Sequence, residues 1–270
     1  MKSIVEIPRP ALRYYGGKWK LAKWIISYFP KHMSYLEPCF GAGSVLLQKR
    51  RSQIETVNDL DSNVVNFFKM LRDRSENLIK KIELTPWAKE EVEKAFEETE
   101  NLIEKARRFW IRCNMISFQD DSMVFRIRKG KGKPPSNTAV ISDYLYKTAK
   151  RLQGVQIEKL DAIESIKKYE NKNCLIYFDP PYVKSSRTSN GKYQYEMGDS
   201  YHIKAAEVLN DYKGKVVISG YNCSLYDKLY KDWKRVDKKA VGNSQSKKIE
   251  SLWLCPKTVK ELNKSLLIHL

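Results

Sequence analysis

The sequence lacks the features that mark a secreted, membrane-spanning or metal-binding protein. Its five cysteines are an odd number without the paired spacing of a metal site. No apolar run reaches the length of a membrane span, and no segment resembles a signal peptide. The three histidines, His32, His202 and His269, lie in no pattern typical of a catalytic base or a metal ligand. We therefore expect a cytoplasmic protein with reduced thiols, no bound metal and no membrane contact.

Acidic residues are few relative to basic ones. The 270 residues include 50 Lys and Arg against 32 Asp and Glu, a formal net charge of +18. This balance favours a polyanionic partner such as nucleic acid. A solvated, lysine-rich surface is the alternative, but it accounts for the number of lysines and not for their excess over acids. The length suits one α/β domain with an insertion.

Strand-like runs and helical segments alternate at both ends of the chain, whereas the middle differs. The predicted strands cover residues 33–37, 54–58, 174–178, 215–219, 233–237 and 249–255. Residues 62–115 are nearly all helical in pattern. Residues 119–138 combine a β-like alternation at 123–128 with a basic loop rich in Gly and Pro. The middle of the chain therefore reads as an insertion into an α/β domain.

The simplest architecture is a parallel α/β sheet built from two separate parts of the chain. Residues 1–63 and 151–270 would form the sheet, and residues 64–150 would form a mostly helical insertion that carries a β-hairpin. Within the first part, a helix is expected to begin at the glycines near Gly43 and to end near Arg51.

The tetrapeptide Asp179-Pro180-Pro181-Tyr182 directly follows the apolar run 174–178, which reads as a buried strand. In open α/β sheets, ligands bind at the edge where strands end. The prolines stiffen the loop, and a backbone carbonyl of this unit and the Asp179 carboxylate can each accept one N–H of an exocyclic amine. That arrangement turns the nitrogen lone pair toward a methyl donor, so catalysis would be mostly positioning. Tyr182 offers a ring on which a base can stack. A proline-rich turn with a core tyrosine is the alternative.

Two segments near the first predicted strands suit a small cofactor. The run from Glu37 to Ser44 leads from a strand into a Gly41-Ala42-Gly43 turn, where the backbone can approach a ligand closely. Asp59 ends the next strand, where a carboxylate can hold ribose hydroxyls. A helix N-cap is the alternative role for Asp59, although Asp61 or Ser62 can cap that helix instead.

A third segment, Arg13-Tyr14-Tyr15-Gly16-Gly17-Lys18, suggests a loop that wraps a ligand. Lys18 can neutralise the carboxylate of a methionine moiety, and Tyr14 can pack beside it. The alternative for Lys18 is a solvated position at a helix N-terminus.

These four motifs together resemble those of the Dam-type, class α (D12) N6-adenine-specific DNA methyltransferases. RYYGGK, EPCFGAGS, NDLD and DPPY occur in the family's order, with an insertion before DPPY. The resemblance covers the whole chain except the insertion. It implies a Rossmann-like methyltransferase sheet with a target-recognition insertion at 64–150. It also implies transfer of a methyl group from S-adenosylmethionine to N6 of an adenine flipped out of double-stranded DNA.

The resemblance also implies roles for single residues. The family contacts S-adenosylmethionine through residues that correspond to Tyr14, Lys18, Asp59 and Asp179. With the residues argued above, the predicted cofactor-binding set is Tyr14, Lys18, Glu37, Phe40, Gly41, Gly43, Asp59 and Asp179. The predicted catalytic set is Asp179, Pro180, Pro181 and Tyr182. Cys39 departs from the family, which usually has Phe there, while Phe40 lies one step later.

Basic residues indicate where DNA would bind. Five of them crowd one short segment: Arg126, Arg128, Lys129, Lys131 and Lys133. A basic hairpin of this size fits a major groove, whereas a loop without specific contacts is the alternative. Arg13 is a further candidate, because the family's residue at that position touches DNA. On the predicted helix, Arg107, Arg108 and Arg112 either contact phosphates or form the solvated face.

Several alternatives stay open at this point. Methylation of cytosine N4 in DNA, of adenine N6 in RNA or of a protein glutamine uses similar chemistry, although the cytosine and glutamine enzymes often replace the residue equivalent to Asp179. A DNA-binding module that has lost catalysis is a further alternative. The segment 114–135 does not clearly match the hairpin of members that read GATC, so the recognition sequence is not assigned. A cognate restriction endonuclease and a bacterial or phage origin are compatible with the resemblance.

Overall fold

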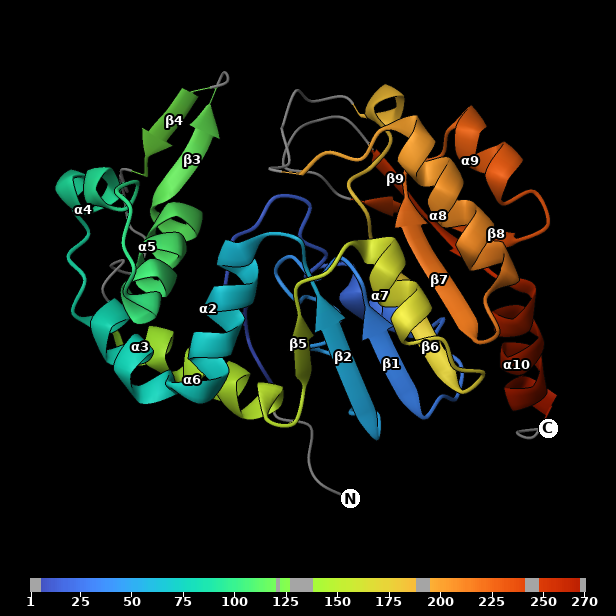
Figure 1. Cartoon of the computed structure of the whole chain (residues 1–270), viewed down its shortest axis with the longest axis horizontal. Helices are drawn as coiled ribbons and strands as arrows, with labels where there is room; N and C mark the ends of the chain where they lie inside the picture. Colours follow the sequence, from blue (N-terminus) through green and yellow to red (C-terminus); the bar gives the residue numbers. More distant parts are fainter. Residues whose placement is uncertain (1–5, 120–121, 127–137, 188–194, 241–247, 268–270) are drawn as a thin grey trace. The chain divides into compact units, whose positions relative to one another are not determined.

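The computed structural model describes residues 6–119, 122–126, 138–187, 195–240 and 248–267, and everything below concerns these residues. The chain forms two compact units, each built from several segments (Figure 1). One, here called the helical unit, comprises Met1–Trp19, Gly41–Gln48 and Asp61–Ile157. The other, the sheet unit, comprises Lys20–Phe40, Lys49–Leu60 and Glu158–Leu270. The division into a catalytic part, residues 1–63 and 151–270, and a target-recognition insertion, residues 64–150, stays a prediction.

A seven-stranded sheet dominates the fold. Its strands are β1 (Ser34–Glu37), β2 (Ile54–Asn58), β5 (Gln156–Glu158), β6 (Cys174–Phe178), β7 (Lys215–Gly220), β8 (Lys234–Ala240) and β9 (Lys248–Leu254). Their order is β5-β2-β1-β6-β7-β9-β8. Numbered along the chain, this order begins 3-2-1-4-5, as in Rossmann sheets. β1, β2, β6 and β7 run parallel, and β9 is antiparallel to both its neighbours. The predicted Rossmann-like α/β fold is confirmed.

The central strands are apolar because both faces of the sheet are covered. All five residues of β6 are buried. On one face, Ile176 and Ile218 pack in a cluster with residues of α7 (Ala162–Lys168), α8 (Asp199–Asp211) and α9 (Ser224–Leu229). Figure 1 shows α7 and α8 lying across this face. Tyr177 alternates to the other side, where its ring lies 5.8 Å from that of Phe29.

Three further short elements complete the sheet unit. They are α1 (Ala22–Ile26), the 3-10 turn η1 (Lys184–Ser186) and α10 (Pro256–Leu267).

The helical unit contains five helices and a hairpin. The helices are α2 (Ser62–Asp73), α3 (Ser75–Glu83), α4 (Lys89–Lys94), α5 (Leu102–Met115) and α6 (Thr138–Leu152). Helix α2 begins at Asp61, whose side chain accepts a hydrogen bond from the backbone N–H of Asn63 at 2.8 Å. Asp61 is therefore the cap, and the alternative role of Asp59 as a helix cap is wrong. Phe67 of α2 and Phe109 of α5 pack edge to face in the core of this unit.

The hairpin lies earlier in the chain than the sequence pattern predicts. Strands β3 (Ile116–Gln119) and β4 (Ser122–Phe125) lie side by side in Figure 1. They pair antiparallel, with Ile116 opposite Phe125. The expected alternation at 123–128 therefore contributes only one strand, because β3 continues directly from the end of α5. Arg126 ends the hairpin, where its backbone N–H donates to the carbonyl of Met115 at 2.8 Å.

The helix expected between Gly43 and Arg51 is wrong, because this segment forms consecutive turns. Its carbonyls have other partners: the Arg151 guanidinium donates to the carbonyl of Leu46, and the Gln48 side chain donates to that of Ser44. Side chains thus take acceptors that a regular helix would use.

Among the described residues, none of the helices is long and apolar enough to cross a membrane.

Candidate active site

The carboxyl edge of the sheet gathers polar side chains in the sheet unit. Because β1, β2, β6 and β7 are parallel, the residues that end or follow them, Glu37, Asp59, Asp179 and Tyr221, belong to the same edge. Strand β9 runs the opposite way, so its first residues reach this edge. Ser251 pairs with Gly220, the last residue of β7, and Glu250 lies one step nearer the edge.

Tyr182 is held tightly at this edge. Its side chain is buried, at 5% exposure, and its hydroxyl donates a hydrogen bond to the carboxylate of Glu250. The ring of Tyr221 packs edge to face against it, with 4.7 Å between ring centres. Burial, followed by the charges of Asp179 and Glu250, raises the pKa of Tyr182 well above its usual value, so the hydroxyl stays protonated. The ring of Tyr182 is therefore almost fully buried among the described residues.

The backbone of the tetrapeptide is braced as well. Asp179 follows β6 directly, and Pro180 is buried. At the other end, Arg187 donates through Nε to the carbonyl of Tyr182 at 2.6 Å. Arg187 also forms two hydrogen bonds with the carboxylate of Glu196, at 2.9 and 2.7 Å. Arg187 therefore supports the tetrapeptide from within the sheet unit.

A group of carboxylates surrounds Cys39. Burial raises the pKa of the Cys39 thiol well above its usual value, and the charges of Asp59, Asp179, Asp161 and Glu37 add to the effect. Where the resembling family usually has Phe, this chain thus has a partly buried, protonated thiol near four carboxylates.

Asp161 was missed by sequence reasoning. It caps α7 by accepting from the backbone N–H of Ile163 at 2.9 Å, and it accepts a hydrogen bond from the Tyr201 hydroxyl at 2.8 Å. The signal that could have found it is the same as for Asp59: a carboxylate in the loop after a strand, just before a helix.

The loops after β1 and β2 are tied to each other. The backbone N–H of Phe40 donates to the carbonyl of Asn58 at 2.9 Å. The Asn58 side chain donates to the carbonyls of Pro38 and Leu160, at 2.9 and 3.0 Å. The Tyr35 hydroxyl donates to Glu37 at 2.9 Å. Glu37, Phe40 and Asp59 therefore lie on loops of well-defined geometry within the sheet unit.

The helical unit holds the other predicted cofactor residues. Gly41 and Gly43 have φ of 50° and 66°, a conformation that favours glycine. A Cβ on Gly41 would lie 3.2 Å from the Tyr14 ring, so the ring of the first motif packs directly on the glycine turn. The Ser44 hydroxyl is buried and has no hydrogen-bond partner in the part of the chain that the structure describes.

Lys18 belongs to the same unit and is only 6% exposed. Its ammonium donates to the carbonyl of Gly16 at 2.8 Å. Because the side chain is buried, the alternative of a solvated lysine is wrong. A buried ammonium beside a glycine turn suits the capture of a carboxylate.

The predicted DNA-binding residues are only partly described. Arg128, Lys129, Lys131 and Lys133 lie outside the described residues. Arg126 donates through Nε to the carbonyl of Ile116, so its guanidinium helps to hold the base of the hairpin. Trp87 donates to the carbonyl of Arg126 at 3.0 Å. Arg13 is exposed. Burial raises the pKa of Tyr144, and the charge of Arg13 partly offsets this rise.

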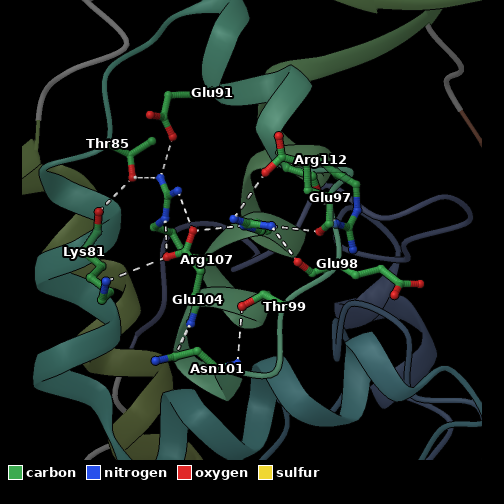
Figure 2. A network of polar contacts seen from close by, with 12 residues as sticks. Lys81, Thr85, Glu91, Glu97, Glu98, Thr99, Asn101, Glu104, Arg107 and Arg112 are labelled. Carbon is green, nitrogen blue, oxygen red and sulfur yellow. Dashed lines mark hydrogen bonds and ion pairs between the residues drawn. The ribbon is translucent and has the colours of Figure 1, made fainter.

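The arginines of α5 form a network within the helical unit (Figure 2). Arg107 contacts the carboxylates of Glu104 and Glu91, each at 2.7 Å. Arg108 donates to Glu104 at 3.0 Å, and Arg112 donates to the carbonyl of Ala95. These contacts contradict the alternative in which the arginines form a plain solvated face. Contact with DNA phosphates stays a prediction. The network ties α5 to α4 and to the loop after it.

Glu104 gives this network a pH dependence. Hydrogen bonds from Arg107 and then from Arg108 lower the pKa of Glu104 from 4.5 to about 2. A carboxyl with a lowered folded-state pKa contributes stability above its unfolded pKa and loses it as pH falls through the folded value.

We therefore expect Glu104→Gln to destabilise the protein at pH 7 but to have a shrinking effect between about pH 4.5 and pH 2. Urea unfolding of both proteins across this range measures the difference. Glu98→Gln, a change in an exposed neighbour, serves as the control. A difference in the free energy of unfolding that does not change with pH would contradict the lowered pKa of Glu104.

In the described part of the chain, no group of three or more His, Cys, Asp or Glu side chains could hold a metal ion.

Comparison with known proteins agrees with the motifs. Residues 14–243 match the model of the D12 class N6 adenine-specific DNA methyltransferases. The type II methyltransferase M.MjaIII of Methanocaldococcus jannaschii is 25% identical and aligns with 89% of this chain and 94% of its own length. The type II methyltransferase M1.LlaDCHI of Lactococcus lactis subsp. cremoris is 24% identical, over 83% and 85% of the two chains. An rRNA methylase structure from Streptococcus thermophilus has a TM-score of 0.38 at 7% identity. Because the family model matches most of the sequence, this chain belongs to the D12 class of N6 adenine-specific DNA methyltransferases.

Proposed function

We propose that this chain transfers the methyl group of S-adenosylmethionine to N6 of an adenine that is flipped out of double-stranded DNA. Membership of the family makes the chain a site-specific adenine DNA methyltransferase. The methyl donor, the flipping of the base and the residue roles are the proposal. The observation that carries them is the braced tetrapeptide that begins at Asp179, at the carboxyl edge of a Rossmann-like sheet.

Each unit, taken by itself, offers residues that suit a part of S-adenosylmethionine. In the helical unit, the buried Ser44 hydroxyl without a described partner and the glycine turn that contacts Tyr14 are features that a bound ligand would use. In the sheet unit, Asp59 and Glu37 would accept ribose hydroxyls, and Phe40 would contact the cofactor. Lys18 would neutralise the cofactor's carboxylate. When bound, S-adenosylmethionine would supply a methyl group on a positively charged sulfur, which leaves as a neutral thioether.

Asp179 and Pro180 would hold the amine. The Asp179 carboxylate accepts one N–H of adenine N6, and the Pro180 carbonyl accepts the other. The nitrogen lone pair then points away from both acceptors, toward the methyl group. As the bond from N6 to the methyl carbon forms, the bond from that carbon to sulfur breaks and positive charge develops on N6, which the carboxylate stabilises. N6 then gives up one proton, to this carboxylate or to water. Pro181 keeps the loop stiff, and Tyr182 would contact the flipped base.

DNA would be held chiefly by the helical unit and its basic segment. We propose residues 64–150 as the target-recognition region, with Arg13, Arg126, Arg128, Lys129, Lys131 and Lys133 as DNA contacts. The net charge of +18 supports a DNA partner. The name "type II methyltransferase" of two relatives supports the further proposal that a restriction endonuclease of the same specificity accompanies this enzyme in a bacterial or phage-infected cytoplasm.

Sequencing of DNA from a methylation-free host that expresses this chain tests the proposal. We expect N6-methyladenine within one short sequence motif, and none in a host that expresses the Asp179→Ala variant. Methylation at cytosine N4, or in RNA alone, would reject the proposal. A folded protein that binds DNA without transferring any methyl group would reject it as well.

A further inference from the structure

Glu250 is a buried carboxylate near the carboxyl edge of the sheet. It belongs to β9, which lies between β7 and β8, and it is only 4% exposed. The residues that follow it in the strand, from Ser251 to Leu254, are almost fully buried. Burying a carboxylate is costly unless a hydrogen-bond donor compensates. Because a strand does not require a carboxylate at this position, the group that binds Glu250 indicates what this residue does.

That partner is the last residue of the tetrapeptide. The Tyr182 hydroxyl donates to the Glu250 carboxylate across 68 positions of sequence. The two elements meet because β9 runs antiparallel to β7, which brings the beginning of β9 to the carboxyl edge. Tyr221, which follows β7, packs against the same ring. The sequence predicts a strand at 249–255, but no local pattern singles out Glu250.

The contacts around Tyr182 clamp the tetrapeptide at its far end. Its beginning, Asp179, continues directly from β6, which the parallel strands β1 and β7 flank. Its end is held through the backbone by Arg187 and through the side chain by Glu250. Between these two anchors lie the acceptors that we assign to the adenine amine. Methyl transfer depends on how exactly they are placed, since a shift of about 1 Å can slow a reaction about 100-fold.

We propose that Glu250 is a positioning residue for methyl transfer. It fixes the ring of Tyr182 through the hydroxyl, and the fixed ring keeps the Asp179-Pro180 acceptors in the geometry that orients the target amine. The inference rests on the proposed function of this site. It requires an acceptor at position 250 that can bind the hydroxyl, and it does not require contact between Glu250 and the DNA or the cofactor.

Four variants test this role: Glu250→Ala, Glu250→Gln, Tyr182→Phe and the double variant Glu250→Ala/Tyr182→Phe. Single-turnover methylation is measured with saturating S-adenosylmethionine and duplex DNA that carries the wild-type recognition site. We expect Glu250→Ala and Tyr182→Phe each to slow the reaction about 10- to 100-fold. Glu250→Gln should stay within about threefold of wild type, because its amide oxygen can accept the same hydrogen bond. The double variant should be no slower than the slower single variant.

Glu55→Gln is the matched control. Glu55 is equally buried, but it lies at the opposite end of β2 and pairs with Lys49 at 2.6 Å. We expect it to lower the melting temperature while the single-turnover rate of the folded protein stays unchanged. The dissociation constant for S-adenosylmethionine, measured for all variants, should be the same for Glu250→Ala as for wild type. Loss of rate without loss of cofactor affinity is the result expected of a positioning role.

Several results would overturn the inference. One is a wild-type rate in Glu250→Ala. Another is a Gln variant as slow as the Ala variant. A third is a double variant in which the two losses multiply, since Glu250 would then act independently of Tyr182. If Glu250→Ala does not fold, the other two single variants decide. A wild-type rate in Tyr182→Phe, or a loss of rate of about 10- to 100-fold in Glu250→Gln, would then overturn the inference. If the wild-type chain methylates no adenine, the proposed function and this inference both fail. If wild type is active and the variants do not behave as expected, only the inference fails.

Discussion

Replacing Asp179 by Ala should abolish methyl transfer while leaving the fold and DNA binding intact. The carboxylate is the side-chain acceptor that we assign to the adenine amine, and it carries the charge that would stabilise developing positive charge on N6. Removing one group of this kind from an active site costs at least about 100-fold in rate. The measurement is the single-turnover rate of methylation, with DNA affinity determined in parallel.

The sign of the effect on DNA binding is a second check on Asp179. Because DNA is a polyanion, removing a carboxylate from the site should leave affinity unchanged or raise it. Asp211→Ala, a change in an exposed carboxylate at the end of α8, should alter neither quantity. Turnover retained by Asp179→Ala would rule out the role that we assign to this residue.

Replacing Lys18 by Ala should weaken the binding of S-adenosylmethionine about 10- to 100-fold. A hydrogen bond to a charged group contributes about 1.5–3 kcal/mol, and each 1.4 kcal/mol corresponds to a tenfold change in affinity. Lys18 is buried and held at the carbonyl of Gly16, so its charge has a defined place within its own motif. Isothermal titration calorimetry with the cofactor alone measures the effect without DNA or turnover.

Lys20→Ala provides the comparison for Lys18. This lysine lies two positions further along the chain and is exposed, so the same loss of charge should leave the dissociation constant unchanged. An equal loss of affinity in both variants would point to a general effect of charge. No loss in Lys18→Ala would show that the cofactor's carboxylate has another partner.

Much of the fold could be predicted because it depends on local patterns. The apolar run 174–178 is the strand β6, and Asp179 follows it at the sheet edge as the tetrapeptide predicts. The predicted sheet with a mostly helical insertion that carries a hairpin is confirmed in type, although the hairpin begins at Ile116. The error there is one of boundaries: α5 passes into β3 without any turn residue between them, and no local signal separates the two.

The turn segment after Gly43 shows the opposite case. Its sequence suits a helix, but the distant Arg151 and the Gln48 side chain take carbonyls that a helix would need. Sequence position alone does not reveal which remote donors compete for a backbone acceptor. The expected helix is therefore absent for a reason that lies in the tertiary structure.

The sequence by itself determined the type of sheet, the motifs at its carboxyl edge and the family to which the chain belongs. These follow from short runs of residues, whose strand and turn preferences and chemical groups act locally. Only the tertiary structure decided that Glu250 holds Tyr182 and that Arg107 of α5 reaches Glu91 of α4. Buried polar groups must find partners, and the partner is whichever complementary group the folded chain brings within reach. That choice depends on strand order and register across long stretches of sequence, which no local pattern contains.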